Sequence, residues 1–328
     1  MSRRNFLRAG IGAGLAAGHL GRRAHASSTT AEPPPAIPRR PLGRTAETLS
    51  VIGFGGMVVK DATDSEAIER VSAAMDRGVN YVDVSPIYGN AQEKLGVALE
   101  GRRDKVFLAC KTNKRTKAEA AAELEESLRL LRTDHVDLYQ LHSMTSKKDV
   151  ETALGEGGAV EAFVEAREKG RTRFIGFSAH SDYAAMACMD RFDFDTVLYP
   201  LNIALWENGF SPQVIERAED KGMGCLGLKA MALDVIPPGE KKKFKKCWYN
   251  PISEPAMIAL ALRFALSKGL TAAVPSGDEG LFTIALNSKD LAKPLDEAET
   301  ASLRKLYAGL NPLFSPYVGN GTRRTRGT

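Results

Sequence analysis

The sequence predicts an α/β fold, a (β/α)8 barrel of the TIM type, on three observations. Short apolar or β-branched runs recur eight times, amphipathic segments separate them, and the length of this region suits one large barrel. A doubly wound open sheet is the alternative, but that fold normally places Gly-x-Gly-x-x-Gly after its first strand. Gly53-Phe-Gly-Gly-Met57 stands there instead, so the barrel is favoured.

The predicted strands share a short run of residues with high β-propensity, and a helical or loop segment follows each of them. In chain order they are Val51–Phe54, Tyr81–Val84, Val106–Cys110, Val136–Leu141, Phe174–Phe177, Thr196–Tyr199, Gly224–Leu228 and Thr271–Val274.

The clearest helical segments lie between these strands and carry apolar residues at helical spacing. Leu124, Leu128 and Leu131 follow the i, i+4, i+7 rule. The predicted helices are Asp64–Asp76, Lys117–Arg132 and Val160–Lys169. After the seventh strand, residues 233–252 form an insertion on the face where the carboxyl ends of the strands meet, and it ends in Cys247-Trp-Tyr249.

The first 26 residues have the three parts of an export signal. Ser2-Arg-Arg-Asn-Phe-Leu7 is a twin-arginine pattern, an apolar stretch rich in Gly and Ala follows it, and Ala24-His-Ala26 offers a cleavage site. We therefore expect the twin-arginine export machinery to deliver a folded protein to the periplasm or beyond. Residues 27–40 are a Pro-rich linker, residues 41–310 the barrel and residues 311–328 a C-terminal tail.

Charge and cysteine content exclude several classes of protein. Five of the 45 Lys and Arg residues lie within residues 1–26, which hold no acid, so the rest of the chain carries 40 cations and 40 acids. A nucleic-acid-binding domain needs a surplus of cations, so no nucleic-acid partner is expected. The four cysteines show no zinc-finger or CxxC spacing, which predicts neither a disulfide scaffold nor a metal site. The oligomeric state stays open.

Four polar residues follow three consecutive predicted strands, where a barrel brings side chains into one pocket. They are Asp83 with Tyr88 in the loop beyond it, Lys111 and His142. A lysine beside a phenol favours the ionised form, and an aspartate beside that lysine keeps the ammonium charged. A histidine near the phenol can donate a hydrogen bond to a substrate oxygen. This set predicts a proton donor aimed at a carbonyl group, beside a hydride-carrying cofactor.

These residues lie in segments that resemble the aldo/keto reductase superfamily. Tyr81-Val-Asp-Val-Ser-Pro-Ile-Tyr-Gly89 is similar to its Asp-x4-Tyr-Gly signature, and Lys111-Thr112 and Asp137-Leu-Tyr-Gln-Leu-His142 extend the similarity, which covers nearly all of residues 40–310. The resemblance implies that Tyr88 is the general acid/base, that Lys111 with Asp83 tunes it, and that His142 orients the carbonyl. It implies reversible reduction of aldehydes or ketones, so the expected partner is a small carbonyl substrate.

The resemblance also implies a nicotinamide dinucleotide, NADP or NAD, across the mouth of the barrel. A helix N-terminus that follows a short loop offers backbone N–H groups to its phosphates, and Lys229 can meet the pyrophosphate. The predicted cofactor-binding residues are Gly55, Gly56, Met57, Ser178, Asn202, Lys229, Ser276 and Gly277.

Several positions on the cofactor side depart from the family pattern. Ala179 stands where Asn usually follows Ser178, Leu228 replaces a stacking aromatic, and Ala285-Leu286 stand in the place of Glu-Asn. Asp278 and Glu279 occupy the loop that usually grips a 2′-phosphate, and two acids there would repel it and favour NAD. Two functions remain open: an exported nicotinamide-dependent oxidoreductase, and an exported non-redox binding barrel with a decayed cofactor site.

Overall fold

The computed structural model describes residues 36–316, which belong to one unit, Pro34–Thr328. The predicted export signal, residues 27–35 of the predicted linker and residues 317–328 of the predicted tail lie outside the described residues.

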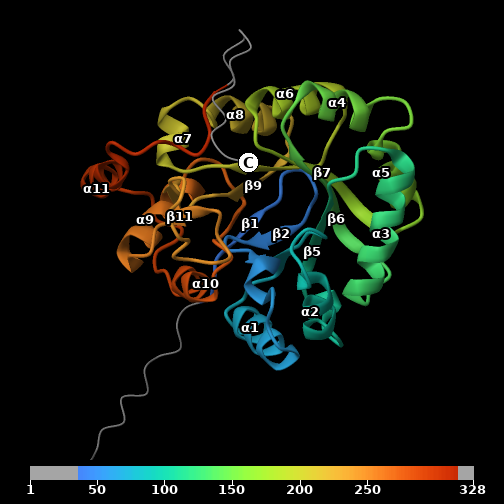
Figure 1. Cartoon of the computed structure of the whole chain (residues 1–328), viewed down its shortest axis with the longest axis horizontal. Helices are drawn as coiled ribbons and strands as arrows, with labels where there is room; N and C mark the ends of the chain where they lie inside the picture. The colour runs from blue at the N-terminus through green and yellow to red at the C-terminus, as the bar shows by residue number, and fades with distance from the viewer. Residues whose placement is uncertain (1–35, 317–328) are drawn as a thin grey trace, which may run out of the picture. The chain divides into compact units, whose positions relative to one another are not determined.

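Eight parallel strands form the barrel, as the sequence predicted (Figure 1). Each strand pairs with its neighbours in chain order, and a parallel bridge between Ile52 and Ala273 joins the first strand to the last. The strands are β3 (Phe54–Gly55), β4 (Tyr81–Asp83), β5 (Phe107–Thr112), β6 (Val136–Met144), β7 (Thr172–Ala179), β8 (Thr196–Pro200), β9 (Gly224–Leu228) and β12 (Ala272–Val274).

Helices connect these strands and surround the barrel (Figure 1). No helix among residues 36–316 is both long enough and apolar enough to cross a membrane. The helices are η1 (Gly56–Val59), α1 (Asp64–Asp76), α2 (Ala91–Ala98), η2 (Arg103–Lys105), α3 (Lys117–Leu131), α4 (Lys147–Leu154), α5 (Ala159–Glu168), α6 (Asp182–Arg191), α7 (Ile203–Glu207), α8 (Pro212–Asp220), α9 (Pro255–Leu266), α10 (Glu279–Leu286) and α11 (Glu297–Tyr307).

Helix boundaries follow local chemistry that the sequence carries. Helix α1 occupies the predicted range because Thr63 and Glu66 form a capping box at its start, in which each side chain accepts from the other residue's backbone N–H. Helix α3 ends at Leu131, one residue before its predicted end, because Arg132 adopts a left-handed conformation with φ of 54°.

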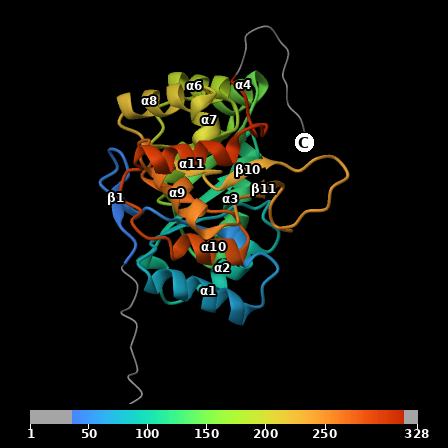
Figure 2. The same cartoon turned by 90° about the vertical axis from the view of Figure 1, so that its left-hand side faces the viewer.

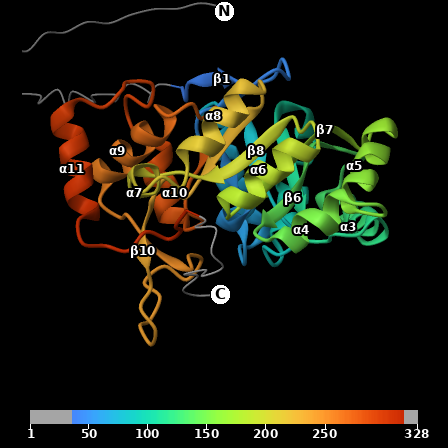
Figure 3. The same cartoon turned by 90° about the horizontal axis from the view of Figure 1, so that it is seen from above.

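Two antiparallel hairpins lie at opposite ends of the barrel (Figures 2 and 3). The first pairs β1 (Arg39–Pro41) with β2 (Thr48–Ser50), and the second pairs β10 (Ala232–Val235) with β11 (Tyr249–Pro251). The second hairpin is the insertion that the sequence predicted, and its loop projects from the barrel. The first was not predicted, and its strand β1 begins within the segment predicted as linker.

The barrel interior and the strand–helix layer form separate hydrophobic clusters. Alternate residues of a strand face opposite sides, so Tyr81 points into the barrel whereas Val82 packs under the helices. The first hairpin contributes Leu42 and Leu49 to the interior cluster, and both are fully buried. The hairpin therefore seals the end of the barrel opposite to the predicted site.

Candidate active site

A buried ion pair joins the ends of two neighbouring strands. Asp83 ends β4 and Lys111 lies in β5, and the Lys111 ammonium donates a hydrogen bond to the Asp83 carboxylate. The Lys111 side chain is 1% exposed and the Asp83 side chain 4%. The same ammonium also donates to the Val84 carbonyl at 3.3 Å. Because Asp83 and the Tyr88 phenol favour its charged form, the pKa of Lys111 lies above its ordinary value despite its burial, which acts in the opposite direction.

The second oxygen of Asp83 is held by two donors inside the barrel. The Tyr81 hydroxyl donates to it at 3.2 Å and the Gln140 side-chain amide donates at 3.4 Å. With Lys111 on the other oxygen, the carboxylate has partners on both sides. A charged pair is tolerated in a barrel interior when such hydrogen bonds replace water.

Tyr88 lies in the loop after β4, half-buried, next to this pair. The Lys111 ammonium is 5.5 Å from the centre of the Tyr88 ring. Burial raises the pKa of the Tyr88 phenol above its ordinary value, and Asp83 adds to this, whereas the Lys111 charge acts in the opposite direction. Lys111 thus acts in the direction that the sequence predicted, but desolvation is the larger effect, so the net pKa of the phenol is raised in the free protein.

His142 lies in β6 and completes the set. Its ring meets the Tyr88 ring edge to face, with the ring centres 5.9 Å apart. Burial, followed by the charge of Lys111, holds the pKa of His142 well below its ordinary value, so the imidazole is neutral near pH 7. The four side chains predicted to act together therefore lie together at the carboxyl ends of β4, β5 and β6.

Two further residues of this site were missed in the sequence. Ser85 places its hydroxyl 3.0 Å from His142 Nδ1, and Gln140 supports Asp83. Both follow from strand alternation, since Ser85 is two residues beyond Asp83 and Gln140 is two residues before His142. The alternation of side chains along a β-strand is the sequence signal that could have identified both residues.

On the cofactor side, the insertion contacts the start of α10. The Tyr249 hydroxyl is 3.0 Å from the Ser276 hydroxyl, and both groups are buried. The backbone N–H groups of Gly277 and Asp278 face the Cys247 sulfur, although burial is the larger effect and raises the pKa of that thiol. A converging set of backbone N–H groups and a hydroxyl is the donor chemistry that suits a pyrophosphate, so the residues present fit a dinucleotide. In the free protein the Tyr249 hydroxyl is paired with the Ser276 hydroxyl.

Asn202 has a structural function that leaves little of its amide for a ligand. Its side-chain oxygen accepts from the Leu205 backbone and caps α7, and its amide nitrogen donates to the carbonyls of Lys229 and Ala232, at 3.2 Å each. The predicted contact of Asn202 with a cofactor stays a prediction. The position of Asn202 nevertheless matters, because its side-chain amide donates a hydrogen bond to the Lys229 carbonyl.

The remaining predicted cofactor contacts are distributed around β3, β7 and the loop after β12. Ser178 is buried and accepts a hydrogen bond from the Ser143 backbone at 2.8 Å. Gly277 packs directly on Met57, where an added Cβ would come within 2.3 Å of the Met57 Cβ, so only glycine fits there. Gly55 and Gly56 are buried beside Val274 and Val84 respectively.

The two acids of the α10 loop do not present free charges, contrary to what their sequence suggested. The Asp278 carboxylate caps α10 by accepting from the backbone N–H groups of Gly280 and Leu281. Glu279 forms an ion pair with Lys246 at 3.2 Å and lies 4.0 Å from Arg70. Repulsion of a 2′-phosphate by this loop is therefore weaker than two unpaired acids would produce.

These observations define a class: a parallel (β/α)8 barrel that gathers a phenol, an ammonium–carboxylate pair and an imidazole at its mouth. The sequence model of the aldo/keto reductase family matches residues 51–247, more than half of the chain. The chain belongs to the aldo/keto reductase family.

Relatives of known sequence agree with this assignment. The chain is 30% identical to the uncharacterized oxidoreductase YqkF of Bacillus subtilis over 155 residues, which are 43% of this chain and 48% of the relative. It is 30% identical to the aldo-keto reductase YhdN of the same organism over 196 residues, 54% of this chain and 56% of the relative. The chain thus spans about half the length of these curated relatives.

Solved structures agree on the fold. The holo form of the aldo-keto reductase AKR11C1 from Bacillus halodurans superposes with a TM-score of 0.63 at 21% identity. The superposition covers 82% of this chain and 96% of that chain. It confirms the (β/α)8 barrel.

Proposed function

We propose that this protein is an oxidoreductase that transfers hydride between a nicotinamide dinucleotide, NADP or NAD, and an aldehyde or ketone. The arrangement of Tyr88, Lys111 and His142 around one point at the barrel mouth carries the proposal. A carbonyl that accepts hydride develops negative charge on oxygen, and these side chains provide donors for that oxygen.

Tyr88 is the proton donor in this proposal. Its raised pKa keeps the phenol protonated at neutral pH, so it can donate a proton to the carbonyl oxygen when hydride is added to the carbonyl carbon. The Lys111 charge stabilises the phenolate that remains after proton transfer, and Asp83 holds Lys111 in place. The proton moves from the Tyr88 hydroxyl to the substrate oxygen, and the reverse reaction returns it.

His142 orients the carbonyl. When the Ser85 hydroxyl donates to Nδ1, the neutral ring carries its proton on Nε2, which can then donate to the substrate oxygen. A lowered pKa is suited to this task, because a neutral imidazole does not compete with Tyr88 as an acid.

The dinucleotide, when bound, supplies the hydride. The backbone N–H groups of Gly277 and Asp278 and the hydroxyl of Ser276 would hold its phosphates, with Cys247 and Tyr249 giving way. Titration of the purified protein with NADH and NADPH, followed by nucleotide fluorescence, tests this binding. Saturable binding, together with oxidation of the nucleotide when an aldehyde is added, is the expected result.

One observation favours the alternative, a binding barrel without redox activity. Cys247, Tyr249 and Asn202 already occupy donors or acceptors on the cofactor side. In that alternative the same titration shows no nucleotide binding at concentrations up to several millimolar, and replacing Tyr88 by Phe has no effect on ligand binding.

Export is a separate proposal that rests on the sequence of residues 1–26. We propose that the twin-arginine machinery transports the folded protein to the periplasm or beyond, with a mature chain that starts at Ser27. Replacing Arg3 and Arg4 by Lys should leave full-length protein in the cytosol. Unchanged processing and delivery of this variant would contradict the proposal.

A further inference from the structure

Lys229 is a half-buried cation at the barrel mouth, directly after β9. Among the described residues, no carboxylate forms an ion pair with its ammonium, and burial lowers the pKa of this amine to about 8. Lys111, at the corresponding end of β5, has Asp83 as its partner. A cation that is removed from water without a counter-ion is costly, so its retention at a mouth calls for a ligand.

The backbone is built to hold Lys229 in this place. Its φ of 67° lies in the left-handed region, which costs free energy for a residue with a side chain, so contacts of the surrounding structure must compensate for it. The Asn202 amide and the Ala232 backbone N–H both donate to the Lys229 carbonyl, at 3.2 and 3.0 Å. Two segments, the N-cap of α7 and strand β10, therefore hold the backbone of this lysine.

Aromatic rings surround the ammonium. It lies 5.0 Å from the centre of the Trp248 ring and 4.6 Å from that of Tyr249, which stabilise it as a cation. Phe314 extends this wall, with its ring 6.2 Å from Trp248 and 5.1 Å from His180. The lining of this region is thus largely aromatic, with one positive charge.

The charge of Lys229 affects His142, the residue proposed to orient the carbonyl. It contributes to the lowered pKa of His142, and it lowers the pKa of His180 together with burial, which is the larger effect. Tyr249 presents its ring to the Lys229 ammonium and its hydroxyl to Ser276 at the start of α10. Lys229 therefore lies within electrostatic range of the Tyr88–His142 centre, beside the face of an aromatic ring.

We propose that Lys229 binds a carboxylate of the substrate, so that the carbonyl compound reduced at Tyr88 carries an acidic group on an apolar body. This proposal rests on the proposed function. An ammonium and a carboxylate form a charge-assisted hydrogen bond, and an aromatic wall accommodates the apolar part of such a compound. The other anion of suitable chemistry is the cofactor pyrophosphate, and the experiments separate the two.

The first experiment compares 4-carboxybenzaldehyde with its neutral analogue 4-formylbenzamide as substrates. The wild type should prefer the acid by about 10- to 100-fold in kcat/KM, the value of a hydrogen bond between charged groups. Lys229→Met should abolish the preference mainly through a higher KM for the acid, and Lys229→Arg should restore part of it. A wild type that prefers the amide would overturn the proposal.

The second experiment needs no turnover, so it decides the question even if hydride transfer is never observed. In a Trp206→Phe background, Trp248 is the remaining tryptophan, and its fluorescence reports ligands near Lys229. Benzoate should bind at least tenfold more tightly than benzamide, and Lys229→Met should remove the difference. Equal binding of the two ligands to the wild type would contradict the proposal.

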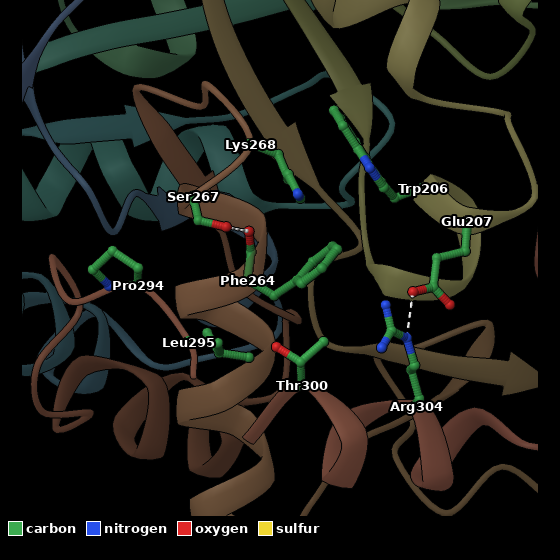
Figure 4. A pocket seen from close by; sticks show the side chains of 9 residues that line it. All are labelled: Trp206, Glu207, Phe264, Ser267, Lys268, Pro294, Leu295, Thr300 and Arg304. Carbon is green, nitrogen blue, oxygen red and sulfur yellow. Dashed lines mark hydrogen bonds and ion pairs between the residues drawn. The ribbon is translucent and has the colours of Figure 1, made fainter. Parts of the chain in front are cut away.

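Lys268 provides a matched control. Its ammonium also lies over aromatic rings, 4.9 Å from Trp206 and 5.2 Å from Phe264, but in a pocket formed by α7, α9 and α11 (Figure 4). Lys268→Met removes the same charge from a similar aromatic setting, and it should leave the preference for the acid unchanged. If Lys268→Met reduced the preference for the acid as much as Lys229→Met does, the preference would come from the overall charge of the protein, and the proposal would be wrong.

The affinity for NADH tests the remaining alternative, in which Lys229 binds the cofactor pyrophosphate. If Lys229→Met weakens NADH binding tenfold while the ratio between acid and amide is unchanged, the lysine serves the cofactor pyrophosphate and the proposal is wrong. Unchanged NADH affinity with loss of the acid preference supports the substrate carboxylate.

Discussion

Lys111 and Lys229 are two lysines at the carboxyl ends of strands in one barrel, and their surroundings differ. Lys111 is almost fully buried, bonded to Asp83 and the Val84 carbonyl, and its pKa is raised. Lys229 is half-buried, lies on two aromatic rings without a carboxylate partner among the described residues, and has a lowered pKa. A cation whose partner is part of the chain serves a neighbouring group, whereas a cation without one is available to a ligand.

The same contrast extends to the two halves of the mouth. On the side of β4, β5 and β6, the polar side chains bond to one another around Tyr88. On the side of β9 and α10, the insertion supplies Tyr249, Cys247 and Lys246 as contacts to the loop after β12. We infer that the first half is assembled before any ligand arrives and that the second half must exchange contacts when a dinucleotide binds.

The largest expected difference between the two lysines is in stability. Lys111→Met leaves the Asp83 carboxylate buried without its cation, so we expect the free energy of unfolding to fall by about 3–5 kcal/mol. Lys229→Met removes a charge that has no such partner, and it should change stability by less than about 1 kcal/mol. Urea denaturation of both variants measures the difference.

A double variant tests whether the unpaired Asp83 carboxylate causes this loss of stability. Lys111→Met with Asp83→Leu removes both charges, so it should recover part of the stability that Lys111→Met loses. If the double variant is less stable than the single one, the buried pair contributes by packing rather than by charge compensation.

The next effect in size is on the rate of carbonyl reduction, and it concerns only the side of the barrel mouth formed by β4, β5 and β6. Tyr88→Phe removes only the hydroxyl, so the rate of carbonyl reduction should fall by about 10²-fold or more, the usual contribution of a positioned acid. Nucleotide affinity and thermal stability should stay near the wild-type values. Reduction of a confirmed substrate at the wild-type rate would show that another group is the acid.

A smaller effect is the pH dependence of the preference for an acidic substrate, which concerns Lys229 on the β9 and α10 side of the barrel mouth. The preference for 4-carboxybenzaldehyde over 4-formylbenzamide requires a charged Lys229, so it should be full below pH 7 and decline as pH rises through about 8. The groups that face this lysine do not titrate there, because burial lowers the pKa of His142 and His180 and raises that of Cys247 and Tyr249. Initial rates for both substrates between pH 6 and 9.5 measure it.

The smallest effect concerns the loop that begins α10. Because Asp278 caps the helix, Asp278→Ala should lower the free energy of unfolding by about 1 kcal/mol, and Asp278→Asn should lower it less. Since the carboxylate is turned toward the helix, the ratio of NADPH to NADH affinity should change less than threefold in Asp278→Asn. A tenfold gain in NADPH affinity would show that this carboxylate does face the 2′-phosphate.

The sequence predicted all eight barrel strands and the position of the insertion, because runs of apolar and β-branched residues are local features, although the first strand is Phe54–Gly55 rather than Val51–Phe54. It missed the β1–β2 hairpin, because its strands are three residues long and the first of them, Arg-Arg-Pro, has no residue with high β-propensity. It also placed Lys111 and His142 near the carboxyl ends of their strands and Tyr88 in the loop after β4, where the structure has them. It could not predict the direction of the net pKa shift of Tyr88, because desolvation depends on packing that no spacing reveals.

The cofactor side was harder to predict for a similar reason. Asn202 and Asp278 have side chains that suit a ligand, but local backbone geometry turns both onto helix starts. Residue type gives the chemistry that a side chain can perform, and the backbone decides whether its partners come from the protein or from a ligand. Lys229 is the converse case, since its ammonium lies against two aromatic rings and has no carboxylate partner among the described residues.

The hairpin at the base of the barrel bears on how the chain is completed during synthesis. The Arg40 guanidinium donates to the carbonyls of Leu266 and Leu270, and the Thr271 hydroxyl donates to the Pro41 carbonyl. Leu266 lies 226 positions after Arg40 in the chain, so these hydrogen bonds can form only when almost all of the barrel has been synthesised. A chain that ends before Thr271 lacks β12, so the bridge between Ile52 and Ala273 that joins the first strand to the last cannot form, and we expect chaperones and proteases to recognise such a chain.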